Sequence, residues 1–180
     1  MTIMTRRILM LLSMLLVMFT VSPIPAKEVR KMTSMRMTSP AFVDSKSIPS
    51  NYTCDGDDQS PPLAIEGVPP EAKSLALVMD DPDAPAGVWV HWVLWNIDPA
   101  TARIAQGSVP PGAEQGENSW KRRNYGGPCP PSGRHRYYFR LFALKERLDL
   151  SPSATRKDLD RAMQGKIVAR CELLGLYSRK

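Results

Sequence analysis

The chain has 180 residues and a formal net charge of +6, with 43% hydrophobic and 23% charged residues. These proportions are ordinary for a globular domain and argue against an intrinsically disordered chain. The 17 prolines argue against a helical bundle and favour a β protein rich in loops.

The N-terminus predicts a secretory signal peptide. Arg6 and Arg7 form a basic start, and an apolar run follows over residues 8–21. That run is short for a membrane span, and prolines and small residues end it. We therefore predict a signal peptide over residues 1–26, cleaved after Ala26, and a location in the periplasm or outside the cell.

The rest of the chain divides into a short tether and one domain. Residues 27–36 are charged and rich in methionine without a clear period, which predicts a tether. A β pattern begins at Met37, so we expect the domain over residues 37–180. The protein would contact a membrane only if the signal segment stayed uncleaved as an anchor.

Apolar and alternating runs predict the strands of this domain. The runs 74–79 and 88–97 are rich in apolar, β-branched and aromatic residues and predict central strands. Strict alternation along the second run would place Trp92 on the opposite face from Trp89, His91 and Trp95. Segments with proline suit sheet edges, because proline cannot donate to a central ladder. The expected edge segments are 39–42 and 48–52. Residues 60–65 lead to an expected turn at 67–70, and a third long strand covers 136–144.

One helix is expected near the C-terminus. Residues 151–154 begin it, and Gly165 ends it. Leu159, Ala162 and Met163 lie on one face of that helix, which predicts that this face packs on the rest of the domain.

These elements define a fold class. A last strand alternates over residues 167–173, and residues 100–123 form a long irregular stretch of the kind that is usually functional. The fold is therefore expected to be mainly β, with an antiparallel or mixed pair of sheets and a small C-terminal helical element.

Three cysteines in an exported chain suggest one disulfide and one free thiol. Cys54 and Cys129 both lie among turn-forming residues, whereas Cys171 has a strand-like setting and resembles a small buried hydrophobe. We therefore pair Cys54 with Cys129. On the chain-entropy model, closing that loop stabilises the fold by about 4 kcal/mol.

The chain has only two histidines, and each follows a dense loop motif. His91 comes after Asp80-Asp81-Pro82-Asp83-Ala84-Pro85, and His135 comes after Gly126-Gly127-Pro128-Cys129-Pro130-Pro131. Each lies where a loop meets an apolar strand, a place where scaffolds present binding groups. Imidazole changes charge near neutral pH, so we predict that the pair forms one small polar pocket.

The basic residues are scattered along the chain, and no RNA-binding or helix-turn-helix pattern accompanies them. The sequence therefore predicts no nucleic-acid partner. Even the run Lys121-Arg122-Arg123 is expected to be a solvated loop, with an acidic partner as the alternative. The excess positive charge favours attraction of small anions.

With these motifs in their order, the chain resembles the phosphatidylethanolamine-binding protein family, also called the Raf kinase inhibitor-like proteins. Within that family it is most similar to the bacterial YbhB/YbcL branch. The resemblance runs from Met37 to about Arg179. The motifs that carry it are Ser39-Pro40-Ala41-Phe42, Cys54-Asp55-Gly56, Ser60-Pro61-Pro62-Leu63, Asp81-Pro82-Asp83-Ala84-Pro85, His91-Trp92-Val93, Gly126-Gly127-Pro128-Cys129-Pro130-Pro131 and His135-Arg136-Tyr137.

The resemblance implies a β-sandwich with a ligand pocket at one end that holds phosphate, carboxylate or phospholipid head groups. Asp81 and His91 would form one wall, and His135 and Tyr137 the opposite wall. The remaining implied pocket residues are Trp89 on an apolar side, Gly126, Gly127, Pro130 and Pro131 on the floor, and Asp83 in the aspartate-proline loop.

The resemblance also implies a binding protein without a cofactor, rather than an enzyme. Its expected partners are a small anion or a phospholipid head group, and a protein partner such as a protease or a kinase that it would inhibit. Two alternatives remain open. One is a hydrolase that uses Cys129 as nucleophile with His91 or His135 as base. The other is a metal site formed by His91, His135 and Asp81.

Overall fold

A computed structural model describes residues 34–179 of the chain. The predicted signal peptide and most of the predicted tether lie outside the described residues. Within the described range, no helix is long and apolar enough to cross a membrane.

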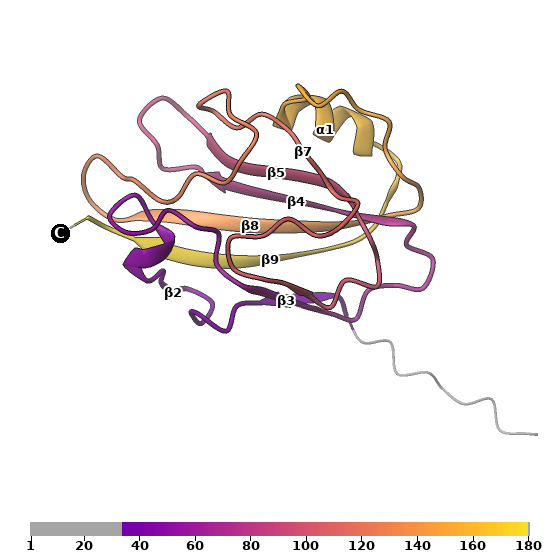
Figure 1. Cartoon of the computed structure of the whole chain (residues 1–180), viewed down its shortest axis with the longest axis horizontal. Helices are drawn as coiled ribbons and strands as arrows, with labels where there is room; N and C mark the ends of the chain where they lie inside the picture. The colour runs from indigo at the N-terminus through magenta and orange to yellow at the C-terminus, as the bar shows by residue number, and fades with distance from the viewer. Residues whose placement is uncertain (1–33, 180) are drawn as a thin grey trace, which may run out of the picture. The chain divides into compact units, whose positions relative to one another are not determined.

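Two sheets form the domain (Figure 1). The larger sheet has six strands in the order β2-β9-β8-β4-β5-β7, and the smaller has three in the order β1-β3-β6. Neighbouring strands are antiparallel except for β2 and β9, which are parallel. In chain order the elements are β1 Arg36–Thr38, β2 Lys46–Ser47, the 3-10 helix η1 Ser50–Tyr52, β3 Leu63–Glu66, β4 Ser74–Asp81, β5 Trp89–Ile97, β6 Arg103–Ile104, β7 Glu114–Gln115, β8 His135–Leu144, α1 Arg156–Met163 and β9 Ile167–Tyr177.

The mainly β fold class and the long strands are confirmed, but the two predicted edge segments are not strands. Residues 39–42 form a bend, in which the Ala41 amide donates to the Ser39 hydroxyl. Residues 50–52 form the 3-10 helix η1 immediately after Pro49. Local side-chain bonds and proline compete with strand pairing in both places.

The inner face of the six-stranded sheet packs on the smaller sheet and forms the larger core. Leu77, Trp92 and Phe139 are fully buried there, together with Ile65 of the three-stranded sheet. Burial of each such side chain contributes about 1.5–3 kcal/mol relative to exposure. This core fixes the inner face on which the predicted pocket lies.

The outer face of the six-stranded sheet has a second core beneath α1. Trp95 and Val93 of β5 pack there with Leu159 and Met163 of the helix. The helix starts later than predicted, because Thr155 is its N-cap and forms a capping box with Asp158. The predicted helical face is confirmed by the burial of Leu159 and Met163.

The disulfide between Cys54 and Cys129 is present, with 5.4 Å between the Cα atoms. Cys171 is free and half-buried against the inner core, where burial raises its pKa to about 11. The cross-link joins loops that are 75 residues apart in sequence, and the Cys54 amide also donates to the Pro128 carbonyl. The segment that precedes β8 is therefore attached to the loop of Cys54 by a covalent bond and by a hydrogen bond.

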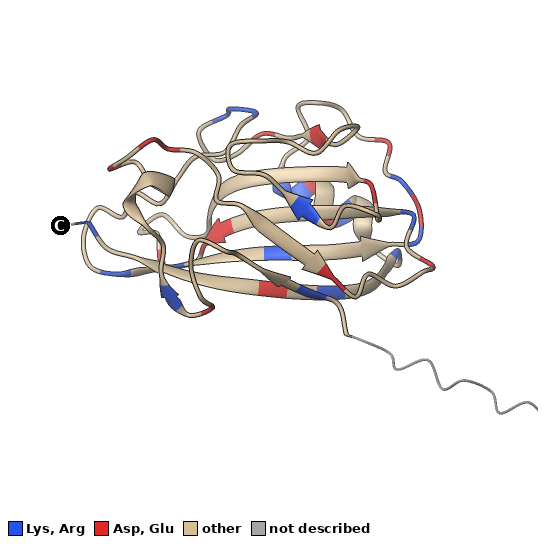
Figure 2. Ribbon diagram, turned by 60° about the horizontal axis from the view of Figure 1, so that its bottom comes forward, with Lys and Arg blue, Asp and Glu red and all other residues tan. Residues whose placement is uncertain are grey.

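Charged residues are interspersed along the strands and loops (Figure 2). At the end of β9, the Tyr177 hydroxyl and the Arg179 guanidinium both donate to the carboxylate of Asp55. Because β9 pairs with β8 so that Tyr177 lies opposite His135, these contacts anchor the strand end beside the predicted pocket.

Candidate functional site

A β-bulge determines where His91 lies. In the β4–β5 ladder, Met79 pairs with Trp92 and Asp80 pairs with Val90, so His91 is the extra residue of β5. The bulge brings the His91 ring to the inner face, where it contacts Tyr137, while Trp95 packs in the outer core. The alternation predicted from the sequence is therefore wrong for His91, which shares the inner face with Trp92.

The His91 ring is held in one tautomer. Its Nδ1 lies 2.6 Å from the Gly126 carbonyl oxygen, and a carbonyl can only accept, so Nδ1 carries the proton and donates. The ring is almost fully buried, and burial lowers its pKa despite the Gly126 bond and the charge of Asp81. His91 is therefore neutral at pH 7, and its Nε2 has a lone pair with which to accept a hydrogen bond.

His135 is oriented by a carboxylate. Its Nδ1 lies 2.7 Å from Oδ2 of Asp81, and both side chains are buried. The other oxygen of Asp81 accepts the amide of Asp83 at 2.8 Å. Asp81 thus fixes the His135 ring with Nδ1 as donor, which leaves Nε2 as the atom available to a ligand.

Tyr137 lies between the two imidazoles. Its ring centroid is 5.3 Å from that of His91 and 6.5 Å from that of His135. Its hydroxyl is buried and makes no well-formed hydrogen bond within the described residues, although the Asp81 carboxylate and the Cys129 backbone lie near it. Burial, and then the charge of Asp81, raise the pKa of Tyr137 far above its ordinary value, so the hydroxyl keeps its proton.

The backbone amides of Gly126 and Gly127 both donate hydrogen bonds within the protein. The Gly126 amide donates to the His91 carbonyl, and the Gly127 amide donates to Asp58 at 2.6 Å. A Cβ on Gly127 would lie 2.7 Å from the Cα of Thr53, so no larger residue fits there. The close approach is therefore to the disulfide-linked loop, and this amide is already engaged within the protein.

Asp83 stabilises the entrance of β8 and does not pair with either imidazole. Its carboxylate accepts the amide and the guanidinium of Arg136, and this partner lowers the pKa of Asp83 to about 2. Of the two prolines predicted for the floor, Pro130 is buried and Pro131 is exposed. The structure thus brings His91, His135, Tyr137 and Asp81 together.

Comparison with known proteins assigns the chain to a family. The model of the phosphatidylethanolamine-binding protein family matches residues 38–178. This chain belongs to the phosphatidylethanolamine-binding protein family.

Relatives of this family cover the whole domain. A UPF0098 protein of Methanothermobacter thermautotrophicus is 51% identical over 150 residues, which are 81% of this chain and 99% of the relative. A solved phosphatidylethanolamine-binding protein homologue from Chlamydia trachomatis has a TM-score of 0.79 and 41% identity, over 82% of this chain and 99% of its own. YbcL from E. coli, described as a member of the mammalian family, has a TM-score of 0.77 and 28% identity, over 82% of this chain and all of YbcL (100%).

One aromatic residue beside His91 was not predicted. Trp120 lies edge-on to both Trp89 and His91, with ring centroids 5.3 Å and 5.1 Å apart. Its indole also lies over Gly126, where a Cβ would come within 2.6 Å of it. The irregular stretch 100–123 indicated that function was near, but nothing in that pattern singled out Trp120.

The chemistry of the alternatives can be compared with these contacts. The sulfur of Cys129 is bonded to Cys54, so in this state it is not a thiolate nucleophile. The part of the chain that the structure describes contains no cluster of three or more histidine, cysteine or acidic side chains that could hold a metal ion.

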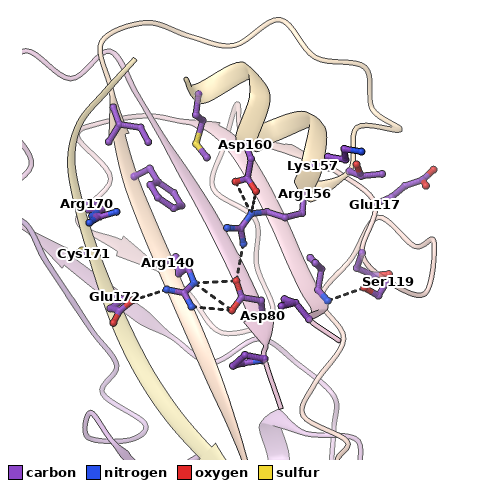
Figure 3. A pocket seen from close by; sticks show the side chains of 18 residues that line it. Asp80, Glu117, Ser119, Arg140, Arg156, Lys157, Asp160, Arg170, Cys171 and Glu172 are labelled. Carbon is purple, nitrogen blue, oxygen red and sulfur yellow. Dashed lines mark hydrogen bonds and ion pairs between the residues drawn. The ribbon is translucent and has the colours of Figure 1, made fainter. Parts of the chain in front are cut away.

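Two hollows lie near the end of β4. A small one of about 660 Å³ borders His135 and is lined by residues of the 132–136 segment, Asp83 and Leu176. A larger groove of about 1170 Å³ lies on the outer face, between α1 and the strands β4, β8 and β9 (Figure 3). Asp80 lies in this outer groove, so the two acidic residues that end β4 serve different faces.

Proposed function

We propose that this family member is an exported binding protein whose pocket takes a small phosphate anion, either free phosphate or the phosphomonoester of a lipid head group. The observation that carries the proposal is the buried Tyr137 hydroxyl, which lies between two imidazoles without a partner in the described protein. Buried polar groups are nearly always hydrogen-bonded, so this one indicates a bound partner.

The hydrogen-bonding capacity of the pocket favours phosphate over a simple carboxylate. Tyr137 offers a donor, whereas neutral His91 offers an acceptor at Nε2. A singly protonated phosphate or phosphomonoester can accept from the tyrosine and donate to the histidine, whereas a phosphodiester has no proton to donate. An ionised carboxylate can only accept, so it leaves the His91 lone pair unmatched unless that ring takes up a proton.

The cross-link supports export. Disulfides persist in oxidising compartments such as the periplasm, and the Cys54–Cys129 bond is compatible with such a location. Inhibition of a protease or a kinase, which the resemblance also implies, remains a prediction.

Calorimetry of phosphate and acetate, with protein recovered from the periplasm, tests the proposal. An intact mass that corresponds to a chain beginning at Lys27 would show export and cleavage after Ala26. We expect phosphate to bind more tightly than acetate, and more tightly near pH 6 than near pH 8, because the protonated phosphate that can donate to neutral His91 is more abundant at the lower pH. His135→Ala should abolish phosphate binding. Equal affinity for both anions at both pH values would contradict the proposal.

A further inference from the structure

Two consecutive acidic residues end β4 on opposite faces of the sheet. Asp81 faces inward and accepts from His135, as described above. Asp80 faces the outer groove, yet its side chain is only 5% exposed because Arg140 and Arg156 both donate to it (Figure 3). A single peptide bond therefore connects the predicted anion pocket to an ionic cluster centred on the buried carboxylate of Asp80.

The backbone ladder is incomplete at this point. On the β8 side, the last register pair of β4 is Asp80 with Tyr138. On the β5 side, the bulge at His91 interrupts the register between Met79 and Asp80. Asp81 is thus carried by a strand end that lies beyond the bulge and is paired on one side only.

Side chains on the outer face compensate for this incomplete ladder. Oδ2 of Asp80 lies 3.1 Å from Nε of Arg140 and 2.8 Å from Nη1 of Arg156. Each arginine is held in turn, because Arg140 pairs with Glu172 and Arg156 pairs with Asp160. The cluster ties the end of β4 to β8, β9 and α1, and multiple charge-assisted bonds give it a fixed geometry.

The segment before α1 also contacts a loop that is hydrogen-bonded to the other wall of the pocket, the His91 wall. The amide of Glu117 donates to the carbonyl of Ala154, next to the N-cap of the helix. The amide of Ser119 donates to Val90, and further along the same loop the amide of Gly126 donates to His91. The helix region is therefore connected to both the His135 wall and the His91 wall.

We propose that Asp80 is a positioning residue for the pocket: clamped by Arg140 and Arg156, it fixes the end of β4 and so holds Asp81 against His135. The effect on ligand binding rests on the proposed function. The effect on the His135–Asp81 hydrogen bond does not, because that bond exists in the ligand-free protein.

Asp80→Asn separates positioning from simple electrostatics. Loss of a negative charge near the pocket would, by electrostatics alone, strengthen the binding of an anion. Positioning predicts the opposite result, because an amide cannot hold two guanidinium groups as a carboxylate does. We expect phosphate affinity to fall about three- to tenfold, in the range of couplings carried through contacting networks.

The experiment compares Asp80→Asn with the matched control Asp160→Asn, which removes an exposed carboxylate from the same cluster but leaves Asp80 clamped. Calorimetry measures phosphate affinity, and NMR of the ligand-free protein follows the low-field proton signal of His135 Nδ1. We expect Asp80→Asn to weaken binding and to shift or broaden that signal, and Asp160→Asn to change neither.

Unchanged or tighter phosphate binding by Asp80→Asn, with an unchanged His135 signal, would overturn the proposal. If Asp80→Asn does not fold, Arg156→Gln takes its place, and the His135 signal decides, because a merely electrostatic role would leave that hydrogen bond in place. If wild-type protein binds no phosphate while the signal still depends on Asp80, the proposed function fails and the positioning role stands.

Discussion

The inner and outer faces of the sheet at the end of β4 differ in how completely their buried polar groups are paired. On the outer face, every group of the Asp80 cluster has an ionic partner within the protein. On the inner face, Asp81 is equally buried and paired, but the neighbouring Tyr137 hydroxyl has no partner. Saturated hydrogen bonding is what stability requires, whereas an unmatched buried donor costs stability and suits a site that a ligand completes.

The segment that leads into β8 on the inner side also carries a covalent cross-link, whereas the outer cluster has only ionic contacts. Removing the disulfide should therefore give the largest loss of stability. Cys54→Ser with Cys129→Ser should lower the free energy of unfolding by about 4 kcal/mol, since the bond closes a long loop. Urea unfolding measures this loss. Cys171→Ser is the control, because that thiol is half-buried and unpaired in the described structure, and it should cost far less. Equal losses in the two variants would refute a structural role for the cross-link.

A pair of buried tyrosines sharpens the comparison at an intermediate scale. Tyr125 donates to the Tyr52 carbonyl at 2.8 Å, so Tyr125→Phe should destabilise the fold by about 1 kcal/mol and leave phosphate affinity unchanged. Tyr137→Phe removes a hydroxyl without a partner, so it should keep the stability or increase it while weakening phosphate binding. Thermal unfolding and calorimetry on both variants check the two opposite patterns. A loss of stability in Tyr137→Phe without a loss of affinity would contradict the assignment.

The smallest expected effect concerns Asp83 at the entrance of β8. Arg136 lowers the pKa of Asp83 from 3.8 to about 2, so the ionised carboxylate favours the folded state. Its contribution is complete above the unfolded value and disappears as the pH falls toward 2. The difference in stability between wild type and Asp83→Asn, followed by acid titration, should therefore be constant above about pH 4 and shrink below it. A difference that persists at the lowest pH would point to packing instead.

Much of this arrangement could be predicted from the sequence, because the relevant signals are local. Apolar runs predicted the strands β4, β5 and β8. Surroundings rich in turn-forming residues distinguished Cys54 and Cys129 from Cys171. The convergence of His91 and His135 on Tyr137 followed from the family resemblance rather than from any spacing.

What escaped prediction depends on contacts between distant segments. The bulge at His91 has no sequence signature in β5, so alternation assigned its face wrongly. Gly127 was expected on the floor of the pocket, but its amide donates to Asp58 in the disulfide-linked loop. The role of Asp80 was hidden because Arg140 and Arg156 lie 60 and 76 residues away.

The anchored end of β9 has a practical consequence for handling this protein. Tyr177 and Arg179 are hydrogen-bonded to Asp55, and Tyr177 lies opposite His135 in the sheet. An affinity tag or fluorescent fusion appended to the C-terminus would therefore emerge next to the candidate site. Attachment of a probe at an exposed position far from it, such as Lys73 at the start of β4, leaves that entrance clear for binding measurements.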